Sequence, residues 1–278
     1  MEVKTAIVPR IPQDTINEIL DHLVADSDFG SLRASALVSK SWIPSCRKHL
    51  FYNVDFTSKN MNRWLKTFPI PDQSPARYVR NLRLWIRRIP RGLFKHSAYL
   101  KNVRRMFLVG WGKVLGFQLP SLWVLPQSVT SLTIDTGAVT LVEIRDIMVR
   151  LPNLDDLSLP GPLFPMDRRE VRGIGKALRG RFRGKLVLHN IRSTNMDVVS
   201  TLLEIPTGLH FTEVEIQCAR ECLPPVVKLV EACCKTIVKL SHAVNTYGKS
   251  HPISWSLWCG VSTLILPTPR CRSRPRAH

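Results

Sequence analysis

The stretches VTSLTI (residues 129–134) and LDDLSL (residues 154–159) share the pattern from which the fold is predicted. Each has an apolar residue at its first, fourth and sixth positions, and the alternation at its end is typical of a strand that buries one face. Related stretches begin at Val79, Val103 and Phe211, and weaker ones at Arg183 and Ile237, so that successive starts lie roughly 24 to 29 residues apart. The sequence therefore predicts a regular series of strands.

Amphipathic helix patterns lie between these predicted strands, over residues 61–68, 141–151, 171–182, 196–203 and 226–233. A strand and a helix repeated at this spacing resemble a leucine-rich repeat, which implies a curved solenoid with a parallel sheet. The repeats are irregular and mostly lack the asparagine that ends the usual consensus, and a generic α/β domain is the alternative. We therefore expect an α/β chain in which residues 57–252 form degenerate leucine-rich repeats.

On each predicted strand, the residues between the buried positions point to the opposite face of the sheet. In a repeat solenoid that face is the concave wall, which is free to bind a partner. The early repeats place arginine and aromatic residues there, and these types are enriched in protein interfaces. We expect a target protein to bind Arg83, Trp85, Phe107, Val109 and Asp135. The alternatives are plain solvent exposure and, for Trp85, burial beneath the carboxyl-terminal segment.

The amino-terminal segment is predicted to form three short helices. An apolar stripe from Ile16 to Leu23 has helical spacing, and we expect Ser31 and Ser41 to cap the second and third helices. The alternation over residues 52–56 predicts a short strand. Three short helices make a thin core, so we expect this unit to lean on a partner or on the rest of the chain.

The stretches IPQDTINEIL (residues 11–20) and VSKSW (residues 38–42) resemble an F-box. That motif begins Leu-Pro, continues with an Ile-Leu helix and ends Val-Cys-Lys-x-Trp; Ile11 and Ser39 depart from it. The resemblance covers residues 10–56 and implies a domain that docks on the Skp-type adaptor of a cullin–RING ubiquitin ligase. The residues expected to form or support that interface are Pro12, Ile16, Ile19, Leu32, Val38 and Trp42. An ordinary helical bundle with a core tryptophan is the alternative.

The charge is strongly positive and unevenly placed. The 278 residues include 40 Lys and Arg and 21 Asp and Glu, for a net charge of +19, and residues 73–134 contain no carboxylate. Such a segment could bind nucleic acid or another anionic surface, or it could be a solvated basic face. No zinc-finger spacing, aromatic RNA-binding signature or helix-turn-helix turn accompanies it.

The sequence offers little support for an enzyme or a metal site. Cys218, Cys222, Cys233 and Cys234 lack the usual zinc spacing, and Cys233 falls on an apolar helix stripe. We expect no catalytic residue, no metal and no cofactor. The odd total of seven cysteines favours reduced thiols, and hence a cytoplasmic or nuclear protein.

The carboxyl-terminal segment departs from the repeat pattern. Residues 253–278 are expected to form an atypical tail with a disordered end, which is either an irregular cap or a sign of a longer array. We expect no membrane segment; a tail anchor at residues 253–267, which are followed by several arginines, is the alternative.

The resemblance to an F-box and to leucine-rich repeats implies that the chain is a substrate-recruiting subunit of an SCF-type ubiquitin ligase, which binds the adaptor and an unidentified target protein. The alternative is a nucleic-acid- or anionic-surface-binding protein that uses residues 73–134.

Overall fold

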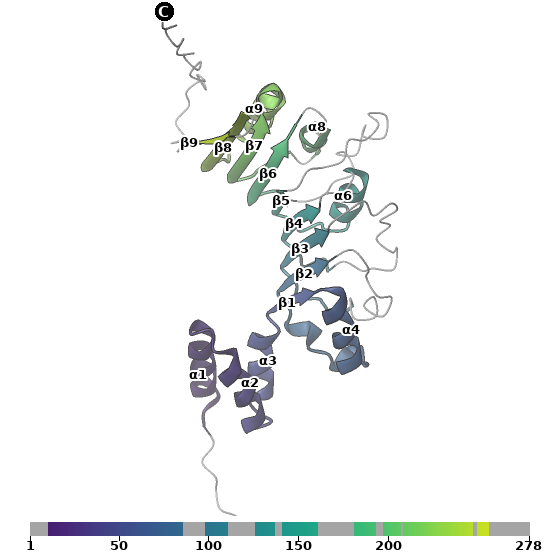
Figure 1. The fold of residues 1–278 in the computed structure, drawn as a ribbon, viewed down its shortest axis with the longest axis vertical. Coiled ribbons are helices and arrows are strands. Elements are labelled where there is room, and N and C mark those ends of the chain that lie inside the picture. Colours follow the sequence, from purple (N-terminus) through teal and green to yellow (C-terminus); the bar gives the residue numbers. More distant parts are fainter. Residues whose placement is uncertain are drawn as a thin grey trace, which may run out of the picture.

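The computed structural model has a mixed α/β fold in which a helical unit precedes a nine-stranded sheet (Figure 1). It describes residues 11–85, 98–110, 126–136, 141–160, 181–192, 197–206, 208–246 and 249–255. In this part of the chain, no helix is both long and apolar enough to cross a membrane.

The helical unit consists of α1 (Gln13–Ala25), α2 (Phe29–Val38) and α3 (Ile43–Leu50). Its core contains four buried side chains, which are Ile16, Leu20, Leu32 and Cys46. Trp42 is half-buried and packs against them. The three predicted helices are therefore confirmed, and their core is separate from that of the sheet.

Both predicted helix caps were wrong. Asp28 caps α2, because its carboxylate accepts the backbone N–H of Ser31 at 3.0 Å and Ser31 itself lies inside the first turn. At α3 the capping position is Trp42, which makes no side-chain cap. The hydroxyl of Ser41 instead bonds to that of Ser39, 2.9 Å away in the preceding turn.

Eight strands run parallel and lie side by side in sequence order, and a ninth closes the sheet in the antiparallel direction. The parallel strands are β1 (Asn53–Phe56), β2 (Asn81–Trp85), β3 (Arg105–Gly110), β4 (Ser131–Thr136), β5 (Asp156–Leu159), β6 (Lys185–Ile191), β7 (Glu213–Ala219) and β8 (Lys239–Thr246). β9 (Lys249–Trp255) pairs with β8. The sheet therefore begins within the predicted 10–56 unit and continues past the predicted boundary at residue 252.

A recurring set of backbone hydrogen bonds joins successive parts of the sheet. Where several of the strands begin, two consecutive N–H groups donate to one carbonyl of the preceding strand-and-helix segment; Arg104 and Arg105, for example, donate to Arg80 at 2.7 and 3.1 Å. The acceptors of such pairs include the carbonyls of Tyr52, Arg80, Arg104, Thr130, Gly184 and Thr212. Asn102 and Asn153 add side-chain bonds of 2.7 and 2.9 Å to the carbonyls of Arg77 and Gln127. Each segment is thus stacked on its predecessor in an equivalent way.

Helices cover one face of the sheet (Figure 1). They are α4 (Ser58–Thr67), α6 (Leu141–Met148), α8 (Asp197–Leu203) and α9 (Leu223–Cys233), with short turns η1 (Pro71–Gln73), η2 (Pro75–Tyr78) and η5 (Arg220–Cys222). Alternate strand residues such as Leu82, Leu84, Met106 and Leu108 share one buried core with these helices. Four of the five predicted helices are confirmed in place, as are all eight predicted strands, including the short one over residues 52–56.

The fifth predicted helix, over residues 171–182, lies outside the described residues except for its last two positions. Phe182 is buried but not helical, because its φ of 49° is in the left-handed region. Its ring lies 5.7 Å from that of Phe211, so it belongs to the core between two strands. The prediction that Phe182 ends a helix was wrong.

Candidate binding face of the sheet

The face of the sheet opposite the helices presents two rows of side chains over its first strands. Strand pairing aligns Asp55, Arg83, Phe107 and Thr133 in one row. Two positions further along, Trp85, Val109 and Asp135 form the second row. No described helix lies over this face (Figure 1). The five residues predicted to bind a target are therefore neighbours on three adjacent strands.

An open groove of about 550 Å³ lies on this face, over β1 to β4. Its lining is made up of Asn53, Val54, Asp55, Asn81, Arg83, Phe107, Val109, Thr133, Asp135 and Pro160. Phe107 is half-buried and Val109 is 5% exposed, so they form an apolar floor. Arg83 and Asp135 are exposed on either side of it. The groove thus combines an apolar floor with one cationic side chain, Arg83, and two anionic ones, which are Asp55 beside Arg83 and Asp135 on the opposite side.

The prediction that Val109 is freely exposed was wrong. Its side chain points to the predicted face, but Trp85 and Asp135 flank it on the neighbouring strands and shield it from solvent. Only a ligand that enters the groove could touch it. Whether a side chain on this face is exposed depends on its cross-strand neighbours, which a single strand pattern does not reveal.

Trp85 was also predicted to be freely exposed on this face, but its side chain is half-buried. Its Nε1 donates a hydrogen bond of 2.9 Å to Oδ1 of Asp55 on β1. The guanidinium carbon of Arg83 lies 5.5 Å from the centre of the indole ring, a cation–π distance. Trp85 therefore holds two of its neighbours in position beside the groove.

The charges of the groove are left without ionic partners in the described part of the chain. The carboxylate of Asp55 accepts the indole N–H, whereas Asp135 has neither a hydrogen bond nor an ion pair there. The Arg83 side chain lies over the Trp85 ring and forms no ion pair with a described residue. The groove thus offers a ligand one positive group, Arg83, and one negative group, Asp135, that makes no hydrogen bond to a described residue, while the second carboxylate, Asp55, already accepts the indole N–H.

A second polar cluster lies on the same face, on β6 and β7. Glu215 accepts from Lys185 at 2.8 Å and bonds His189 at 3.0 Å. The hydrogen bond from Lys185, assisted by that from His189, holds the pKa of Glu215 below its ordinary value despite partial burial. The sequence analysis did not identify this cluster, although aligning the predicted strands, which sets Glu215 beside Val187, could have found it.

A further pair that the sequence did not reveal is Cys218 with His242, whose Sγ and Nε2 atoms are 3.4 Å apart. Burial raises the pKa of the Cys218 thiol to about 12 and lowers that of His242, so both groups are neutral. A neutral thiol is a poor nucleophile and a poor metal ligand. No group of three or more potential metal ligands occurs in the described part of the chain.

The residues predicted to bind the adaptor fall into two sets. Ile16 and Leu32 are buried in the helical core and can only support a surface, whereas Trp42 packs against that core and is half-buried. Pro12, Ile19 and Val38 are exposed. The predicted interface leaves out three other exposed hydrophobic side chains of this unit, which are Ile11, Phe29 and Leu37.

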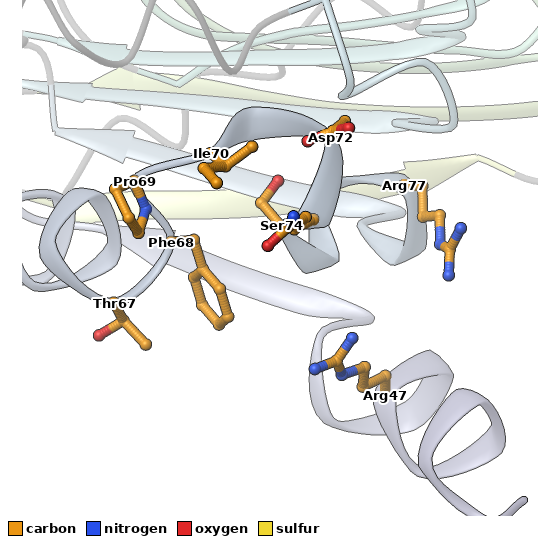
Figure 2. Close-up of a pocket in the computed structure, with 9 residues that line it drawn as sticks. Arg47, Thr67, Phe68, Pro69, Ile70, Asp72, Ser74 and Arg77 are labelled. Carbon is orange, nitrogen blue, oxygen red and sulfur yellow. The ribbon is translucent and has the colours of Figure 1, made fainter. Parts of the chain in front are cut away.

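A second hollow, of about 410 Å³, lies where the helical unit meets the sheet (Figure 2). Arg47 of α3 reaches it from one side, and Phe68, which follows α4, lines it from the other. Phe68 packs edge-on against Trp64, with ring centres 5.1 Å apart, and Phe51 lies within 6.1 Å of both rings. This aromatic cluster connects the end of α3 to the first strand-and-helix segment.

No protein-family model matches the chain, and neither a curated protein nor a solved structure matches it significantly.

Proposed function

We propose that this chain is a substrate-recruiting subunit of an SCF-type ubiquitin ligase. In this proposal, residues 10–56 are an F-box that binds the Skp-type adaptor, and the sheet is a degenerate leucine-rich-repeat solenoid that binds a target protein. The chain contributes no catalytic group of its own. It accelerates ubiquitin transfer by holding the target near the catalytic parts of the ligase.

The observation that carries the proposal is that the helical unit buries few of its large hydrophobic side chains and leaves several others exposed. Four side chains form its small core, while five large hydrophobic ones between residues 11 and 38 remain exposed: Ile11, Ile19, Phe29, Leu37 and Val38. Exposed apolar side chains concentrated in so short a segment indicate a surface that a partner covers. Three of the exposed residues, Ile11, Ile19 and Val38, are also motif positions.

The construction of the sheet supports the second half of the proposal. Strand-and-helix segments follow one another in sequence order, and equivalent hydrogen bonds join their backbones. Stacking of this kind is the behaviour expected of repeat units. The groove on the uncovered face then provides a binding site whose walls come from several successive units.

Nucleic-acid binding by residues 73–134 has less support. Arg80 and Arg104 donate to the backbone carbonyls of Asn102 and Ser128, at 3.1 and 3.5 Å, and thereby join one unit to the next. Two of the basic side chains are therefore used inside the fold. Salt separates the two functions, because nucleic-acid affinity falls steeply with ionic strength while docking through apolar residues persists.

Binding to a purified Skp-type adaptor tests the proposal directly. Val38→Asp should weaken binding of the full chain at least a hundredfold, about 3 kcal/mol, because it places a charge in an apolar interface. Val238→Asp is the matched control: Val38 is 69% exposed and Val238, which directly precedes β8, is 71% exposed. Neither change should unfold the chain. Equal adaptor affinity of the two variants, or no binding by the unmodified chain, would overturn the F-box assignment.

A further inference from the structure

The groove over β1 to β4 is built for a ligand that carries both charges. Its floor is Phe107 and Val109, and the exposed Arg83 and Asp135 form its two walls. Asp55, the third charged residue of the lining, lies beside Arg83 and accepts the indole N–H of Trp85. Neither wall residue has an ionic partner in the described part of the chain. A purely acidic ligand would meet Asp135, and a purely basic one would meet Arg83.

The spacing of the two charges sets the length of the ligand. Arg83 and Asp135 are two strands apart across the sheet and two residues apart along it. With strands about 4.8 Å apart and a rise of about 3.3 Å per residue, their Cα atoms are separated by about 12 Å. Four residues of an extended chain span about 13 Å. Charges at positions 1 and 5 of an extended peptide therefore match the walls.

The apolar floor fixes the middle of that peptide. Side chains of an extended segment alternate in direction, so positions 1, 3 and 5 point the same way. When positions 1 and 5 reach the charged walls, position 3 points to Phe107 and Val109. Contact between an apolar side chain and this floor removes apolar surface from water on both partners.

We propose that the groove binds an extended segment of the target protein in which an acidic, an apolar and a basic residue occupy alternate positions. The inference rests on the proposed function in one respect, which is that the bound segment belongs to a recruited target protein. The acidic residue pairs with Arg83, the basic residue pairs with Asp135, and the apolar side chain between them enters the groove. Stacking on Trp85 holds the Arg83 side chain in place before the ligand arrives, which lowers the entropic cost of binding.

Fluorescent peptides and the full-length chain provide the test. The probes contain DSLSK, KSLSD, DSLSD or KSLSK between glycine-serine flanks, so that both chain directions and both single-sign patterns are sampled. The unmodified protein should bind one of the mixed-charge peptides at least about fivefold more tightly than either single-sign peptide. Replacing the central leucine by serine should remove that binding.

Charge reversal on one wall should change the preference in a defined direction. Asp135→Arg gives the groove two positive walls and should shift its preference to DSLSD, while Arg83→Glu should shift it to KSLSK. Glu231→Arg, an exposed charge reversal on α9, makes the same change in net charge as Asp135→Arg and should keep the preference for the mixed peptide.

Two outcomes would overturn the inference: equal binding of all four peptides to the unmodified protein, or a preference that Asp135→Arg and Arg83→Glu leave unchanged. Adaptor binding is measured on the same variants and should be unaffected. Loss of peptide discrimination with intact adaptor binding rejects this inference alone. Failure of the unmodified chain to bind the adaptor rejects the proposed function.

Discussion

Trp85 donates its indole N–H to Oδ1 of Asp55, 2.9 Å away on the neighbouring strand, and so ties β2 to β1 at the edge of the groove. Asp55 is exposed, whereas the indole is half-buried. The tryptophan therefore contributes both to the stability of the sheet edge and to the shape of the groove. Its substitution is expected to reduce both.

Substitutions at Trp85 separate these two contributions. Trp85→Phe keeps a ring but loses the hydrogen bond, which should lower the free energy of unfolding by about 1 kcal/mol. Trp85→Ser also loses the packing of a half-buried ring and should cost about 2 kcal/mol or more. Urea denaturation measures both. Asp55→Asn, whose Oδ1 can still accept the bond, is the control and should resemble the unmodified protein; unchanged stability of Trp85→Ser would show that the ring is not packed.

Glu215 should make stability depend on pH. Its pKa in the folded chain is lowered by the bonds from Lys185 and His189, so below its ordinary value of 4.5 the unfolded chain takes up a proton more readily than the folded one. The stabilisation is fully present above that pH and is lost as the pH falls through the lower folded value. The difference in unfolding free energy between the unmodified protein and Glu215→Gln should therefore be largest near neutral pH and shrink below about pH 4.5.

Chemical denaturation at several pH values measures this difference. Glu231→Gln, on an exposed face of α9, serves as the control because Glu231 lies outside the cluster. A difference between the unmodified protein and Glu215→Gln that stays constant from pH 3 to pH 7 would contradict the role assigned to Lys185 and His189.

The side chain of Asp156 leaves no room for a Cβ atom at Gly184. A Cβ at this position would overlap the carboxylate of Asp156, which accepts the backbone N–H of Lys185 at 2.7 Å. Gly184→Ala should push that carboxylate away and lower the free energy of unfolding by about 1.5 to 3 kcal/mol, the range for a hydrogen bond to a charged group. Asp156→Ala should cost a similar amount. The double variant should lose less unfolding free energy than the two single variants lose together, because removing the Asp156 carboxylate also removes the clash. Urea denaturation measures these losses, and additive values would show that the two residues are independent.

The fold was largely predictable because its signal is local. A triplet such as Val79, Leu82 and Leu84 predicts a strand that buries one face, and the recurrence of these triplets roughly every 24 to 29 residues indicates both strand order and register. The same alternation placed Arg83 and Phe107 on the uncovered face. Features set by neighbours in space could not be derived in this way.

The features that sequence reasoning missed or predicted wrongly depend on such non-local or competing effects. The burial of Val109 comes from side chains on two other strands. Asp28 and Ser31 are both competent helix caps, and only the point where the loop ends decides between them. Phe182 adopts its left-handed backbone to pack against Phe211, which is 29 positions away in the sequence. The antiparallel return of β9 breaks the period on which the other strand predictions relied.

The cysteines of the described residues should differ sharply in reactivity. Cys234 is exposed, whereas Cys218 and Cys233 are buried and have pKa values raised by burial to about 12 and about 11. Because the thiolate is the reactive form, a maleimide at pH 7.5 should label Cys234 within minutes, while the two buried thiols react only after denaturation. Mass mapping of proteolytic peptides measures the labelling of each site.

His242→Ala provides the decisive comparison. If Cys218 and His242 are both neutral, the imidazole does not activate the thiol, so removing it should not lower the labelling rate of Cys218. Rapid native labelling of Cys218 that disappears in His242→Ala would instead show that the histidine activates the thiol.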